Sequence, residues 1–268
     1  MKISNDTRNV LKNFSTINSG IRVKAGNKVE TISNMKNILA VATVDESFPQ
    51  DFSIYKNATI ITPNQFEVSK VTNFNCTNNI DVAVGKVVYS VISNMYGGIK
   101  SDLTISRLEE NKFWVLAGAG NGMIDISWLR ANAPDDGSVQ IIDWTSAFAG
   151  IGLWGPNSRS VLEKLCDDDD VSNEGFPFFH IKKISISNIP CVAVRISYIG
   201  ELGWEIYTPT EYGLSLWDEL RETSREFNMI CSGAGAFESL RLEKGYRSLG
   251  TDIHTNYNPY ESGLGFTV

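Results

Sequence analysis

The chain has 268 residues, of which 42% are hydrophobic and 21% are charged, as is typical of a globular protein with a buried core. Its formal net charge of -7 argues against a nucleic-acid partner for the main domain, because proteins that bind nucleic acid normally carry a basic face. No apolar run reaches the ~18 residues of a membrane span, and the first residues contain no apolar signal core. We therefore expect a cytoplasmic protein that does not enter a membrane.

The cysteines and histidines do not form a metal-binding pattern. Four cysteines are widely spaced without a CxxC pair, and the chain holds only two histidines. A zinc site of the usual ligand spacing is not expected, and we predict no metal. Sparse cysteine also favours a reducing compartment.

The first 80 residues predict a helix, two strands and an irregular connection. Residues 2–14 carry a capping serine or aspartate and an apolar stripe, which favours a short amphipathic helix. Apolar runs between residues 20 and 44 are typical of two strands, with a turn at Gly26-Asn27. Residues 56–80 are rich in Asn and Thr and include a proline, so we expect an irregular connection there.

From residue 81 to residue 268, apolar strand pairs alternate with amphipathic helices. That alternation predicts an α+β fold in which antiparallel sheets are flanked by helices. Residues 84–98 fit either a strand or a helix, and residues 102–118 predict a hairpin that turns at 109–111. The elements expected beyond this hairpin are helices over 122–133, 157–165, 211–227 and 233–250, a strand pair over 139–156, and a strand pair over 180–200 that turns at 188–190.

The stretch "NMYGGIKSDLTISRL", residues 94–108, places Asp102 shortly after two adjacent glycines. Paired glycines favour a shaped backbone turn, which here would present one carboxylate at the start of a strand. Two interpretations stay open. The aspartate is either a solvated residue of a hairpin turn, or an acid held against a cationic or nitrogen-bearing ligand.

The stretch "SYIGELGWEIYTP", residues 197–209, contains two glutamates four positions apart. Glu201 falls in a turn, where we expect it to be exposed or to bind backbone amides. Glu205 lies between Trp204 and Ile206 on an apolar strand, where a carboxylate is costly unless it has a partner. That partner is either an Arg or Lys in a structural salt bridge, or a ligand with two adjacent N–H donors, as guanine and pterin rings have.

Six stretches occur here in the order in which one known family shows them. They are "GGIKSDLTISRL", "IGLWGPNSRSVLEKL", "FPFF", "SYIGELGWEIYTP", "SLRLEKGYRSLGTDI" and "NPYESGLGF". Together they cover roughly residues 80–268 and resemble the glycine-cleavage T-protein (aminomethyltransferase) family. Within it, the sequence is most similar to the folate-binding portion of dimethylglycine and sarcosine dehydrogenases.

The resemblance implies the aminomethyltransferase folate-binding fold, without the C-terminal barrel into which the family continues. It implies tetrahydrofolate as the acceptor of a one-carbon unit, and a small-molecule amine donor, or a carrier or flavin dehydrogenase partner, as its source. Asp102 matches the family's central acid beside the reacting folate nitrogens. Glu205 matches the glutamate that pairs with the pterin ring, and Tyr89, Tyr198 and Tyr246 match aromatic positions around the same pocket.

Residues 1–55 resemble a different family, the DNA polymerase sliding clamp of tailed bacteriophages, at its N-terminus. The expected domains are therefore a clamp-like segment over 1–55, the connection over 56–80, and an aminomethyltransferase-like domain over 81–268. Two alternatives to a folate-dependent transferase remain, namely a non-catalytic phage-type DNA-replication accessory and an inactive truncated chimera. Because six motifs indicate the transferase and one segment indicates the clamp, we favour the transferase.

Overall fold

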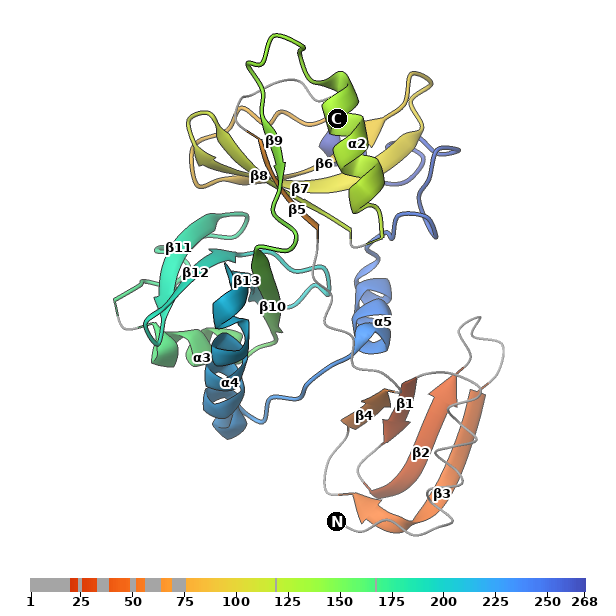
Figure 1. Cartoon of the computed structure of the whole chain (residues 1–268). Helices are drawn as coiled ribbons and strands as arrows, with labels where there is room; N and C mark the ends of the chain where they lie inside the picture. Colours follow the sequence, from red (N-terminus) through yellow and green to blue (C-terminus); the bar gives the residue numbers. More distant parts are fainter. Residues whose placement is uncertain are drawn as a thin grey trace. The chain divides into compact units, whose positions relative to one another are not determined.

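The computed structural model describes residues 76–118, 120–166 and 168–268 with their side chains, and the backbone of five strands between residues 20 and 68. The chain, shown in Figure 1, divides into two compact units.

In the smaller unit, residues 1–60 and 229–244, the described residues form a four-stranded antiparallel sheet and a helix. Its elements are β1 (Gly20–Val23), β2 (Gly26–Ile32), β3 (Leu39–Phe48), β4 (Phe52–Tyr55) and α5 (Ala234–Lys244). The strands lie in the order β3-β2-β1-β4. The turn expected at Gly26-Asn27 is wrong, because both residues lie inside β2. The helix expected over 2–14 lies outside the described residues.

The larger unit, residues 61–228 and 245–268, contains a five-stranded sheet. Its strands are β5 (Asn64–Val68), β6 (Val87–Ser93), β7 (Ile99–Glu109), β8 (Lys112–Ala117) and β9 (Ile141–Asp143). They lie in the order β6-β7-β8-β5-β9, and all neighbouring pairs are antiparallel. The hairpin expected over 102–118 is confirmed as β7 and β8. Residues 84–98, which fitted either a strand or a helix, contain strand β6.

Strand β5 corrects the expectation for residues 56–80, part of which is regular rather than irregular. It lies between two partners in the sheet, with Phe66 opposite Val115 of β8 and opposite Asp143 of β9. Five residues within an Asn- and Thr-rich stretch give too short an alternation to indicate a strand. Pairing with strands that follow much later in the chain is what stabilises it.

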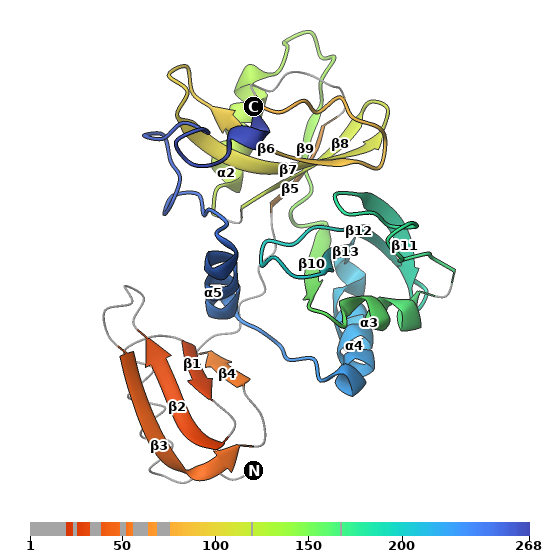
Figure 2. The same ribbon diagram turned by 180° about the vertical axis from the view of Figure 1, so that it is seen from behind.

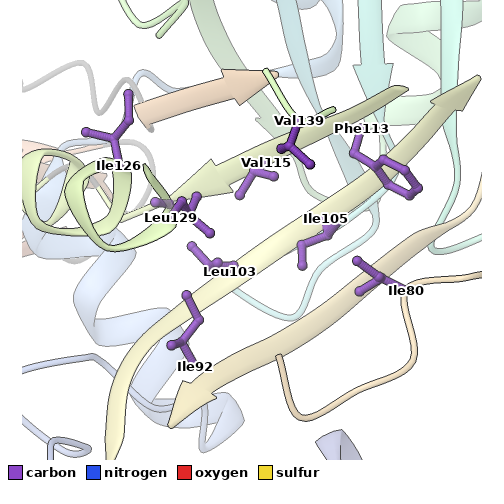
Figure 3. Close-up of a cluster of buried hydrophobic side chains, with 10 residues drawn as sticks. Ile80, Ile92, Leu103, Ile105, Phe113, Val115, Ile126, Leu129 and Val139 are labelled. Carbon is purple, nitrogen blue, oxygen red and sulfur yellow. The ribbon is translucent and has the colours of Figure 1, made fainter. Parts of the chain in front are cut away.

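Helix α2 (Gly122–Asn132) covers one face of this sheet (Figures 1 and 2). Its buried Ile126 and Leu129 belong to the same hydrophobic cluster as Leu103 and Ile105 of β7, drawn in Figure 3. Burying an aliphatic side chain of this size contributes about 1.5–3 kcal/mol. This apolar contact therefore fixes the inward face of the helix against β7.

The chain's last residues, 249–268, lie on the other face of the sheet, away from α2 (Figures 1 and 2). The buried cluster between them and the sheet consists of Val91, Ile99, Ile253 and Leu264. Tyr89 packs against this cluster, and its ring stacks on Phe266 with centroids 6.2 Å apart. The two faces of β6 and β7 are thus covered by different parts of the chain.

A second, four-stranded antiparallel sheet follows in the same unit, with two helices beside it. These elements are β10 (Phe148–Trp154), α3 (Ser158–Leu165), β11 (Ile181–Ile186), β12 (Ile189–Val194), β13 (Gly203–Pro209) and α4 (Gly213–Ser224). The strand order is β10-β13-β12-β11. The turn between β11 and β12 is Ser187-Asn188, with φ of 47° and 66°, one residue earlier than expected. Both residues adopt the left-handed conformation that a two-residue hairpin favours, and Ile189 already belongs to β12.

The two sheets of the larger unit pack on each other through an aromatic cluster. Trp114 of β8 lies 5.2 Å, between ring centroids, from Tyr207 of β13 and from Phe148 of β10. Antiparallel sheets flanked by helices confirm the expected α+β class. No helix in the described part of the chain is long and apolar enough to cross a membrane.

Candidate functional site

Asp102 is the fourth residue of β7, so the expectation that it sits at the start of a strand is wrong. The turn that precedes β7 is closed by Asn94, whose Oδ1 accepts hydrogen bonds from the backbone N–H groups of Tyr96 and Gly98, both at 2.9 Å. Gly98 is required there, because a Cβ at this position would lie 2.0 Å from the carbonyl oxygen of Thr255. Gly98 therefore allows the segment 249–268 to approach the beginning of β7 closely.

The carboxyl group of Asp102 is half-buried and is held by Tyr89 on the neighbouring strand. Val91 lies directly opposite Asp102, and the Tyr89 hydroxyl donates a 2.9 Å hydrogen bond to Asp102 Oδ2. Burial raises the pKa of Asp102, and the hydrogen bond from Tyr89 partly opposes this rise. The same burial, together with the charge of Asp102, raises the pKa of Tyr89, so the tyrosine keeps its proton. A freely solvated aspartate in a turn does not fit this geometry.

Tyr198 and Tyr246 stack on each other in the same region. Their ring centroids lie 6.1 Å apart with an interplanar angle of 23°, and the Tyr198 hydroxyl donates a 2.5 Å hydrogen bond to the Arg247 carbonyl. Tyr198 is also close enough to Tyr89 for its charge to raise the pKa of the Tyr89 hydroxyl. The structure therefore brings together four of the five residues predicted from the sequence, Asp102 included.

Glu205 lies in β13, opposite Gly152 of β10 and Val194 of β12. The Tyr207 hydroxyl donates a 2.5 Å hydrogen bond to Glu205 Oε2. Burial raises the pKa of Glu205, against the opposing effect of this hydrogen bond. Glu205 forms no salt bridge with any residue that the structure describes, so the structural ion pair considered from the sequence is not formed among them. Glu201 is exposed in the preceding turn, as expected.

The two acids lie on sheet faces that pack against each other. Side chains alternate along a strand, so Asp102 shares a face of the five-stranded sheet with the cross-strand pair Thr104 and Leu116. Leu116 belongs to the cluster that joins this face to Tyr207, and Glu205 shares the face of Tyr207 on β13. The carboxyl groups of Asp102 and Glu205 are thus directed toward the same interlayer space from opposite sides.

Sequence reasoning missed the role of Tyr207, which is buried and bonded to Glu205. The spacing Glu205-x-Tyr207 carried the signal, because residues two apart on a strand share a face. Trp204 directly precedes Glu205 in the same stretch. Trp204 points to the opposite face of β13, where it is fully buried beneath Arg159 and Arg195. Trp154 instead covers the site beside Glu205, since a Cβ on Gly152 would collide with its indole ring.

Another hollow, lined by Ser93, Asn94, Met95 and Trp128, contains none of the predicted site residues. Ser93 ends β6, Asn94 and Met95 belong to the turn that follows, and Trp128 belongs to α2. In the described part of the chain, no group of three or more His, Cys, Asp or Glu side chains could hold a metal ion.

Comparison with known proteins identifies the larger part of the chain. The model of the GCVT N-terminal domain family matches residues 66–268, and the chain therefore belongs to this family. Dimethylglycine dehydrogenase of human mitochondria is 35% identical over 189 residues, which are 69% of this chain and 22% of that protein. An aminomethyltransferase of Halothermothrix orenii is 33% identical over 193 residues, which are 72% of this chain and 53% of that protein.

The fold agrees with a solved relative. The glycine cleavage system aminomethyltransferase T of Bartonella henselae superposes with a TM-score of 0.66 and 26% sequence identity, over 78% of this chain and 56% of that one. This confirms the aminomethyltransferase-like fold. The chain spans about a fifth of the length of the dehydrogenase and about half the length of the aminomethyltransferase. These matches do not test the resemblance of residues 1–55 to a sliding clamp, which stays a prediction.

Proposed function

We propose that this member of the GCVT N-terminal domain family binds a reduced folate and passes a one-carbon unit between it and an amine. The observation that carries this proposal is a pair of half-buried carboxyl groups on facing sheets, each of which accepts a hydrogen bond from a tyrosine hydroxyl. Asp102 and Glu205 have no cationic partner among the described residues. A half-buried carboxyl group without a cationic partner is suited to accept hydrogen bonds from the N–H groups of a ligand.

Glu205 is the proposed recognition residue for the pterin ring. A carboxylate that accepts two adjacent N–H bonds forms charge-assisted contacts, which are stronger than neutral ones. The Tyr207 hydroxyl occupies one lone pair of Oε2 and fixes the orientation of the carboxyl group, so the other lone pair of Oε2 and both lone pairs of Oε1 remain for the ligand. This arrangement selects a planar heterocycle with two parallel donors.

Asp102 is the proposed acid beside the reacting folate nitrogens. Because burial raises its pKa, the carboxyl group can hold or release a proton nearer to neutral pH than an exposed aspartate can. The Tyr89 hydroxyl keeps the carboxyl group in one orientation. The stacked rings of Tyr198 and Tyr246 supply an aromatic wall for the same ligand.

The source of the one-carbon unit is a second part of the proposal. One relative is a dimethylglycine dehydrogenase and another is an aminomethyltransferase. We propose a small-molecule amine as donor, delivered freely, on a carrier, or by a flavin dehydrogenase partner. The folate site described above would be the same in each case.

Titration of the 268-residue chain with 5-formyltetrahydrofolate, followed by tryptophan fluorescence, tests the proposal. We expect a saturable change in emission, reported by Trp154 next to Glu205 rather than by the enclosed Trp204. A Trp154→Phe variant that still binds, as measured by calorimetry, should lose most of that signal. Absence of binding by both methods would overturn the proposal and favour an inactive scaffold.

A further inference from the structure

The indole ring of Trp154 lies on a seat formed by two glycines, one on β10 and one on β13. Trp154 is the last residue of β10 and is paired with Gly203, the first residue of β13. A Cβ on Gly203 would lie 2.5 Å from Cδ1 of the indole, and a Cβ on Gly152 would lie 2.0 Å from Cη2 at its far end. A side chain at either position would therefore force the ring to move.

This glycine seat places the indole beside the carboxyl group of Glu205. Gly152 lies directly opposite Glu205, and residues paired in this way project from the same face with Cβ atoms about 4.5–5.5 Å apart. Three ring atoms of Trp154 lie within 2.7 Å of the position that a Cβ on Gly152 would take. The ring is therefore a direct neighbour of the Glu205 side chain, whose carboxyl group is oriented by the Tyr207 hydroxyl.

The polar edge of the indole is fixed by a hydrogen bond. Trp154 Nε1 donates to the carbonyl oxygen of Ile196 at 3.1 Å, in the segment between β12 and β13 that also carries Tyr198. The ring cannot leave its seat without breaking this bond, so it forms a fixed wall. Trp154 is half-buried, whereas Trp114 and Trp204 of the same unit are 2% and 0% exposed. An indole that only filled the core would be enclosed as those two are.

We propose that Trp154 is a specificity-determining residue on which the pyrimidine half of the pterin ring stacks while Glu205 binds the N–H edge of that half. This inference rests on the proposed function and adds which part of the ligand the site recognises. The amino group and the ring N–H that one carboxylate can bind as a pair both belong to the pyrimidine half. A flat wall beside the carboxyl group supports the face of the ring whose edge is bound. Because this half is planar in oxidised and reduced pterins alike, both can make the contact.

Two substitutions at Trp154 separate stacking from packing. Trp154→Phe and Trp154→Leu both lose the hydrogen bond to Ile196 and both fill part of the seat, but only phenylalanine offers an aromatic face. We expect Kd to be about fivefold higher or more in the leucine variant than in the phenylalanine variant. Calorimetry measures Kd for 5-formyltetrahydrofolate and for pterin-6-carboxylate, which has the ring but no glutamate tail. The ratio should be the same for both ligands, because the ring alone makes the contact.

Trp144→Leu is the matched control. Trp144 is also half-buried, but it stacks on Phe148 at the opposite end of β10, so its loss should leave Kd unchanged. Equal Kd values in Trp154→Phe and Trp154→Leu would overturn the inference and leave the proposed function in place. An unsubstituted chain that binds neither ligand would overturn both.

The unsubstituted chain gives a second reading if the leucine variant does not fold, as judged by its thermal unfolding. In a nitrogen-15 NMR spectrum, the indole N–H resonance of Trp154 is the one that Trp154→Phe lacks. A ring stacked on the indole should shift this resonance through its ring current as pterin-6-carboxylate saturates the site, and should shift the Trp144 resonance much less. A Trp154 resonance that stays in place at saturation, in a chain that binds the ligand, would overturn the inference.

Discussion

The Tyr89 hydroxyl donates a 2.9 Å hydrogen bond to Asp102 Oδ2, so the acid on β7 is held by the adjacent strand β6. Both residues lie on the sheet face covered by residues 249–268, while α2 covers the other face. The orientation of the proposed reacting acid is thus built into the sheet.

Replacing Asp102 by Asn should remove most one-carbon transfer while the fold persists. The amide has nearly the same shape and its oxygen can still accept the Tyr89 hydrogen bond, so the loss in stability should be about 1 kcal/mol or less. The amide cannot take up or release a proton in the same way. Thermal unfolding and transfer to tetrahydrofolate should be measured together. Turnover that stays within twofold of the unsubstituted chain would refute the assigned role.

Replacing Tyr89 by Phe should raise the pKa of Asp102 further. The hydrogen bond from Tyr89 favours the ionised carboxyl group, so its removal leaves burial less opposed. The ring would still stack on Phe266, and the cost in stability should be about 1 kcal/mol. Carboxyl titration by NMR measures the effect directly. A downward shift of the Asp102 midpoint would show that the hydroxyl does not act as inferred.

Replacing Glu205 by Ala should weaken folate binding more than it weakens folding. Each charge-assisted hydrogen bond contributes roughly 1.5–3 kcal/mol, and about 1.4 kcal/mol corresponds to one decade of affinity. A loss of two such bonds predicts at least a tenfold rise in Kd, measured by calorimetry. Glu201→Ala is the control, because that glutamate is exposed in the preceding turn. If Glu205→Ala lowers the thermal midpoint and leaves Kd unchanged, Glu205 is structural.

Stability should depend on pH through Asp125. Its pKa rises from 3.8 to about 6 on folding, so the folded state binds the proton more tightly than the unfolded chain. Below about pH 4 both states are protonated and there is no penalty. Between about pH 4 and pH 6 the penalty grows, to ~3 kcal/mol at most, and it then stays constant as pH rises.

Asp125→Asn should therefore flatten the pH dependence of the free energy of unfolding over that interval. Urea unfolding at pH 4.5 and pH 7.5 measures the difference for both proteins. The comparison between the two pH values matters more than either absolute value, because the buried amide has an unsatisfied polar group of its own. An unchanged difference would mean that Asp125 ionises as an ordinary exposed aspartate does.

Gly98→Ala should be strongly destabilising, and Gly97→Ala much less so. A Cβ on Gly98 would lie 2.0 Å from the Thr255 carbonyl oxygen, so the backbone of one segment must move. A Cβ on Gly97 meets no atom within 4 Å, and only its positive φ of 84° carries a cost, roughly 1–2 kcal/mol. Thermal unfolding of both variants tests the ranking. Equal midpoints would show that the approach of residues 249–268 to β7 is not essential.

The sequence alone determined the fold class and most element types beyond residue 81. Amphipathic periods and turn residues are local, so the hairpin of β7 and β8 and helix α2 could be read directly. Six collinear motifs also identified the family before any geometry was known. Strand β5 was not predicted from the sequence, because its stability comes from pairing with distant strands and not from its own five residues.

Only the tertiary structure decided how the predicted residues meet. The sequence placed Asp102 at the start of a strand and left open whether it is solvated, but pairing with β6 puts it inside a strand, where it accepts a hydrogen bond from Tyr89. The two-residue spacing puts Tyr207 on the face of Glu205, but the hydrogen bond between them and the burial of Asp125 on the inward face of α2 are known only from the structure. Burial and charge coupling depend on which surfaces pack together, and packing joins residues that are far apart along the chain. Local sequence patterns therefore identify the acidic residues. Their pKa values depend on how the sheets and the helix pack around them.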